Sequence, residues 1–180
     1  DISYTDADLA ETVPGVTRVR EEPGGTFDLV LALDVIEHVP DPLEFLRTQV
    51  HPRLARHTTL LASVPAYAWL FGPHDVRLRH FRRYGRREFT GELSTVVDVV
   101  ADGSLFTSLV PLRAAANLAH RVTGAEPAAE TQWSGPGWAA TAVSAVLRTD
   151  ARAGVALGRA GVRVPGLSWW ALGRAAASRG

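Results

Sequence analysis

Two short apolar runs, separated by an amphipathic segment, constrain the fold of this chain more than any other feature. The runs are FDLVLALD at 27–34 and TTLLASVP at 58–65. Each is short enough to be a strand buried on both faces, as in a parallel sheet. Between them, 41–55 reads as a helix that begins at Asp41, with one apolar stripe made of Leu43, Leu46, Val50 and Leu54. Strand, helix and strand joined by short links predict an α/β, doubly wound, mostly parallel sheet.

The rest of the chain predicts further elements of the same domain. The expected elements are a strand at 16–21, a helix at 84–94, a strand containing a turn at 95–106, helices at 110–122 and 138–161, a linker at 125–137 and a last strand at 164–175. We treat 1–180 as one domain in which 95–161 is a less regular, largely helical region. Apolar residues crowd one side of the 110–122 helix, so we expect that helix to be buried.

Composition excludes several classes of protein. The formal net charge is zero and 46% of the residues are hydrophobic, so no overall field attracts nucleic acid or anionic lipid. The chain has no cysteine, which excludes disulfides and thiolate metal sites. No apolar stretch approaches the roughly 20 residues that span a bilayer. We therefore expect a cytoplasmic protein. The sequence also lacks methionine, and we expect it to be part of a longer gene product.

Polar side chains follow both apolar runs. Asp34, Glu37 and His38 come after the first run, and His74 and Asp75 come after the second. The carboxyl ends of parallel strands share one edge of a sheet, where ligands of such folds bind. We therefore expect the two segments to meet in one crevice. Within it we expect Glu37 to be a solvated or capping acid.

Three segments together resemble class I S-adenosylmethionine-dependent methyltransferases of a broad bacterial group. They are FDLVLALDVIEHVPDPLEFLR, LLASVPAYAWLFGPHDVRLRHFRRYGRREF and GLSWWALGRA. The resemblance implies a Rossmann-like sheet with an antiparallel last strand. It also implies a first strand with a glycine-rich loop, and no such loop occurs in this sequence. We therefore expect residues 27–34 to have an unpaired edge, or to pair there with the 16–21 strand, and the isolated chain to aggregate readily.

The resemblance also implies site roles and a function. The function is methyl transfer from S-adenosylmethionine to a small-molecule acceptor, with little activity expected from this chain alone. Histidine is a suitable base because its unperturbed pKa lies near 6.5. The expected residues are Asp1, Leu33, Asp34 and Val35 for the cofactor, His38 and His74 for catalysis, and Asp75, His80, Arg83 and Tyr84 for the substrate.

Three alternatives remain open on the residues alone. The chain could be a non-catalytic Rossmann-like binding module. Arginines within 77–87 could bind nucleic acid, although acids elsewhere offset their charge. A divalent metal ion could be held by oxygen and imidazole ligands drawn from Asp34, Glu37, His38 and His74. Of these possibilities we expect no bound metal, no nucleic-acid partner and no membrane partner.

Overall fold

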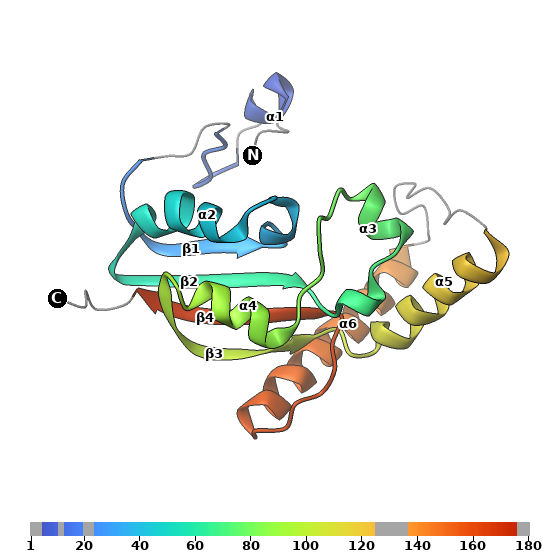
Figure 1. The fold of residues 1–180 in the computed structure, drawn as a ribbon. Coiled ribbons are helices and arrows are strands. Elements are labelled where there is room, and N and C mark those ends of the chain that lie inside the picture. The colour runs from blue at the N-terminus through green and yellow to red at the C-terminus, as the bar shows by residue number, and fades with distance from the viewer. Residues whose placement is uncertain (1–4, 11–12, 20–23, 125–136, 176–180) are drawn as a thin grey trace.

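The computed structural model describes residues 5–10, 13–19, 24–124 and 137–175. It is an α/β structure built on a mixed four-stranded sheet in the order β1-β2-β4-β3. The strands are β1 (Phe27–Leu33), β2 (Leu54–Pro65), β3 (Val97–Leu105) and β4 (Ser168–Ala175). β1 and β2 are parallel, and β4 is antiparallel to both β2 and β3. Three strands therefore point the same way, and the last strand runs against them, as predicted (Figure 1).

The helical segment between β1 and β2 begins where the sequence indicates. Asp41 is the N-cap, and its carboxylate accepts the backbone N–H of Glu44 at 3.0 Å. The segment is not one regular helix. It consists of α2 (Pro42–Phe45), a π-helical turn (Leu46–Val50) and a 3-10 turn (His51–Arg53). The wider π turn moves the apolar stripe, so Leu46 and Val50 are buried whereas Leu43 is 50% exposed.

The helices after β2 are α3 (Pro73–Arg77), α4 (Arg86–Leu93), α5 (Leu109–Thr123) and α6 (Gly137–Arg159), and α1 (Asp6–Ala10) precedes β1. Of these, α4, α5 and α6 lie close to the helices predicted at 84–94, 110–122 and 138–161, whereas α1 and α3 were not predicted. The predicted turn within the third strand is instead a shift of register between Val99 and Ala101. The prediction that the 110–122 helix is buried is wrong, because Leu112 and Leu118 of α5 are more than 60% exposed. None of the described helices is long and apolar enough to cross a bilayer.

The core lies on one face of the sheet, under α2 and α4 (Figure 1). There Leu60, Ala62 and Val64 of β2 pack with Leu46 and Phe89. α6 packs against β3, where a Cβ on Gly154 would lie 2.9 Å from a carbonyl oxygen of β3. The opposite face is thinly covered at β1, where Leu29, Leu31 and Leu33 are each about half exposed.

β1 is the edge strand of the sheet. Among the described residues it pairs only with β2, which confirms the unpaired edge expected from the sequence. A hollow of about 340 Å³ runs along this edge, and its lining includes Leu29, Leu31, Phe45 and Val50. The strand predicted at 16–21 is wrong for residues 16–19, since only Val16 forms a bridge, with Val13. Residues 20 and 21 and most of the 125–137 linker lie outside the described residues.

Candidate functional site

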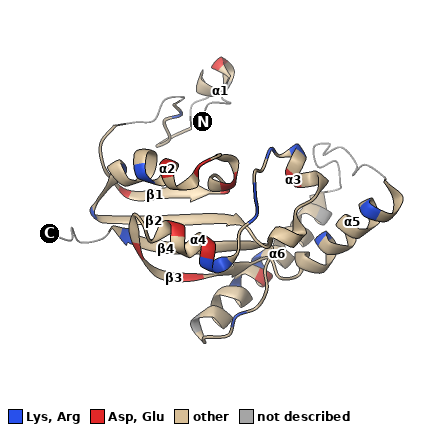
Figure 2. Cartoon of the chain, viewed as in Figure 1, with Lys and Arg blue, Asp and Glu red and all other residues tan. Residues whose placement is uncertain are grey.

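The segments that follow the two parallel strands meet at the carboxyl edge of the sheet. The backbone N–H of Phe81 donates to the carbonyl of Glu37 at 2.8 Å. The Arg82 guanidinium donates to the carbonyl of Pro40 at 2.6 Å. Figure 2 shows acidic residues in the turn after β1 and arginines in the segment between α3 and α4. The predicted meeting of the two segments is confirmed.

Both segments begin with a residue in a left-handed conformation. Asp34 has φ 50° and Tyr67 has φ 62°, values that non-glycine residues seldom adopt. Asp34 is held there by β2, because its N–H donates to the Ser63 carbonyl at 3.0 Å and its carboxylate accepts the Ser63 hydroxyl at 3.1 Å. Backbone strain of this kind concentrates at functional sites. The bend directs the chain after Asp34 into a 3-10 turn, Ile36–His38.

Asp75 is the centre of a buried polar network. Its side chain is fully buried and accepts hydrogen bonds from the Gly72 N–H at 2.9 Å, Arg83 at 2.8 Å and Arg113 of α5 at 2.6 Å. Burial alone would raise the pKa of Asp75. The charge of Arg83, the Gly72 N–H and the charge of Arg113 outweigh burial and hold this pKa below its ordinary value. Asp75 is therefore ionised at neutral pH.

The ionised Asp75 fixes the orientation of His80. Nδ1 of His80 lies 3.0 Å from the Asp75 carboxylate. A carboxylate can only accept, so Nδ1 carries the hydrogen and Nε2 keeps its lone pair when the ring is neutral. Burial lowers the pKa of His80, against the opposing effect of Asp75, and so favours the neutral ring. Nε2 points toward Glu37, whose Oε1 lies 3.9 Å away.

Glu37 and His38 complete a cluster with His80. Glu37 is fully buried, and burial raises its pKa to about 7. The exposed His38 ring meets the His80 ring edge to face, with 4.6 Å between centroids. One ligand atom from each of Glu37, His38 and His80 lies within 4.8 Å of the others. The expectation that Glu37 is solvated or capping is wrong.

The residues predicted to contact the cofactor lie at the open edge of the sheet. Leu33, Asp34 and Val35 are exposed at the carboxyl end of β1. Asp1, the fourth residue of this group, lies outside the described residues. The predicted contacts with S-adenosylmethionine stay predictions.

The residues predicted for catalysis and substrate divide into two sets. His38 and His80 belong to the cluster with Glu37, whereas His74, in α3, does not. Asp75, Arg83 and Tyr84 are buried and offer a substrate almost no surface. Arg83 donates to Asp75 and to the Ala66 carbonyl, so it supports the site instead of lining it.

Two functional positions in α5 were missed. Arg113 donates to Asp75, and the buried Asn117 donates to the Leu70 carbonyl at 2.7 Å. These two residues attach α5 to the segment that carries Asp75. Their spacing of one helical turn places them on the same side of α5, and these two polar residues within the apolar first three turns of the helix were the available signal.

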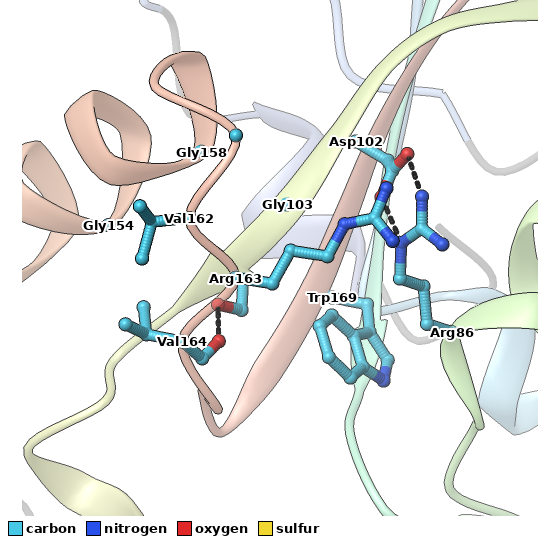
Figure 3. A pocket seen from close by; sticks show the side chains of 11 residues that line it. Arg86, Asp102, Gly103, Gly154, Gly158, Val162, Arg163, Val164 and Trp169 are labelled. Atoms are coloured by element: carbon cyan, nitrogen blue, oxygen red, sulfur yellow. Dashed lines mark hydrogen bonds and ion pairs between the residues drawn. The ribbon is translucent and has the colours of Figure 1, made fainter.

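A second hollow lies away from this site, between β3, α6 and the segment before β4. It has a volume of about 100 Å³ and is lined by Arg86, Asp102, Arg163 and several glycines. Figure 3 shows Arg163 extending toward the ion pair of Arg86 and Asp102. Arg86 and Asp102 pair with each other, and Gly154 permits close contact between α6 and β3, so we assign this hollow to packing.

No family model matches the chain, and no curated protein matches it significantly.

Proposed function

We propose that this chain is part of an enzyme that transfers a methyl group from S-adenosylmethionine to a small-molecule acceptor. The observation that carries this proposal is the meeting of Glu37, His38 and His80 at the carboxyl edge of the parallel pair β1 and β2. Ligands of open α/β sheets bind at this edge. The two segments that meet are those on which the resemblance to methyltransferases rests.

Two features of the sheet support the proposal that the fold is Rossmann-like. The last strand is antiparallel to its neighbours, as the resemblance implies. Among the described residues, β1 has one unpaired edge bordered by an apolar hollow. The resemblance expects the first strand of a larger parallel sheet beside this edge. Leu33, Asp34 and Val35, the expected cofactor contacts, lie at its carboxyl end.

The cluster provides a histidine base and a residue that positions it, both of which a protein can use in methyl transfer to an oxygen or nitrogen atom. The cofactor brings a reactive sulfonium methyl group, so the protein mainly aligns the acceptor, excludes water and removes a proton. His38 is the exposed imidazole of the cluster and is the proposed base. His80, oriented by Asp75, fixes the position of the His38 ring through their edge-to-face contact.

Cofactor binding is the direct test. The 180-residue chain, labelled with ¹⁵N, is titrated with S-adenosylmethionine and with S-adenosylhomocysteine while its amide resonances are recorded. We expect weak binding that shifts the resonances of residues 33–38. Asp34→Asn should reduce these shifts. Asp98→Asn is the matched control, because Asp98 is an exposed acid near the amino end of β3, at the opposite edge of the sheet.

Two results would contradict the proposal. One is the absence of any shift at 33–38 with millimolar cofactor. The other is an equal response to adenosine, which lacks the amino-acid end of the cofactor. Either result favours a non-catalytic binding module.

A further inference from the structure

Glu37 presents an unusual arrangement of buried charge. Its side chain has no exposed surface, and neither carboxylate oxygen has a hydrogen-bond partner among the described residues. Buried polar groups are nearly always hydrogen-bonded, and an unpartnered buried carboxylate is strongly unfavourable. The nearby Arg83 donates instead to Asp75 and Ala66. Both oxygens of Glu37 are thus free to contact a cation.

The two histidines supply the matching nitrogen atoms. Asp75 accepts the Nδ1 hydrogen of His80 at 3.0 Å, which leaves the Nε2 lone pair directed toward Glu37. A carboxylate that orients a histidine in this way is the usual outer partner of a metal-binding imidazole. His38 reaches the same point from the turn after β1 and is exposed, so the site is open to solvent on that side.

The spacing of the three ligand atoms suits one ion. They lie within 4.8 Å of one another. Bonds of about 2.1 Å to one metal place neighbouring ligand atoms about 3.0 to 3.4 Å apart, so the three atoms would move closer together when an ion binds. We propose that Glu37, His38 and His80 bind one divalent transition-metal ion, with Asp75 as the positioning residue that orients His80.

The ligand set determines the class of ion. Two imidazoles and one carboxylate suit Zn²⁺, Fe²⁺, Co²⁺ and Mn²⁺, whereas Mg²⁺ and Ca²⁺ prefer oxygen ligands throughout. Three protein ligands leave further positions for water or for an oxygen of a small molecule. Open positions of this kind are typical of catalytic metal sites and not of structural ones. The metal site does not depend on the proposed methyl transfer; when a metal ion is bound, His38 is a ligand and does not act as the base.

Metal binding can be measured without any enzymatic assay. The full chain, free of affinity tags and treated with a chelator, is titrated with Zn²⁺ by calorimetry and with Mn²⁺ by electron paramagnetic resonance, and with Mg²⁺ for comparison. His38→Ala and Glu37→Gln each remove one ligand. His51→Ala is the matched control, because His51 is an exposed histidine outside the cluster.

We expect one ion to bind per chain and to raise the unfolding temperature. His38→Ala should weaken the affinity by well over about tenfold, a loss seen even when outer partners of a ligand are removed. His51→Ala should bind as the unchanged chain does. Glu37→Gln should lose binding while remaining folded, since it removes a buried unpartnered charge. The absence of saturable Zn²⁺ and Mn²⁺ binding, or equal affinity in His38→Ala and His51→Ala, would overturn the proposal.

Discussion

Replacing Glu37 by glutamine should stabilise the metal-free chain by an amount that depends on pH. Burial raises the pKa of Glu37 from 4.5 to about 7. Each pKa unit corresponds to about 1.36 kcal/mol, so the ionised carboxylate costs the folded chain about 3 kcal/mol. The glutamine side chain has nearly the same shape and carries no charge. It avoids this cost at every pH.

The sign of the effect follows from the direction of the pKa shift. Below pH 4.5 Glu37 is protonated in both the folded and the unfolded chain, so no penalty applies. As the pH rises from 4.5 to about 7 the unfolded chain ionises first, and the stability of the folded chain falls. Above about pH 7 the full penalty is present. The advantage of Glu37→Gln should therefore grow by about 2 to 3 kcal/mol between about pH 5 and about pH 8.

Urea unfolding at several pH values, with a chelator present, measures this difference. At each pH the free energy of unfolding of the unchanged chain is subtracted from that of the variant. This subtraction removes the contributions of all other titrating groups. Any constant difference in the hydrogen bonding of the amide adds the same amount at every pH and so does not affect the change with pH. Glu44→Gln is the matched control, since it removes an exposed carboxylate on α2. An advantage of Glu37→Gln that stays constant within about 0.5 kcal/mol over this range would refute the reasoning.

Four further variants test the sheet and the attachment of α5. Leu31→Lys should raise the monomeric fraction in light scattering and change the free energy of unfolding by less than about 0.5 kcal/mol, because Leu31 is 54% exposed. Ala32→Lys, on the buried face of the same strand, should prevent folding as judged by circular dichroism. Gly103→Ala should destabilise the chain by about 1 to 3 kcal/mol in urea, because its Cβ would lie 2.7 Å from the Trp170 indole. Arg113→Met removes one of two guanidinium groups from a buried carboxylate and should make α5 more sensitive to limited proteolysis.

The parallel unit could be predicted because local pattern and tertiary burial agree there. The run at 27–34 and the run at 58–65 became β1 and β2, and Asp41 caps the helix between them. The same reasoning failed at 16–19. These residues alternate in the manner of a strand, but the bridge between Val13 and Val16 is isolated and lies outside the four-stranded sheet. β-propensity describes how a side chain fits a sheet, and it cannot supply the neighbouring strand.

The site could be predicted only in part, for a different reason. The sequence placed His38 and the 74–84 segment at one edge of the sheet, because both follow parallel strands. It could not show that Glu37 is buried, since the burial depends on residues about 40 positions later in the chain. Phe81 binds the backbone of Glu37, and His80 lies against its side chain. A single buried glutamate produces no periodic pattern in the sequence, so periodicity cannot predict its burial.

The chemistry of the cluster is set by its supports as much as by its three members. Asp75 receives donors from Gly72, His80, Arg83 and Arg113, which lie on α5 and on the segments before and after α3. The charge of Asp75 keeps the Nδ1 hydrogen of His80 in place, and that hydrogen leaves Nε2 free to face Glu37. A change in the packing of α5 would therefore alter the cluster through the Asp75 carboxylate. This dependence explains why a helix with an exposed apolar surface still carries a partly buried arginine, and it makes α5 part of the site although it contributes no ligand.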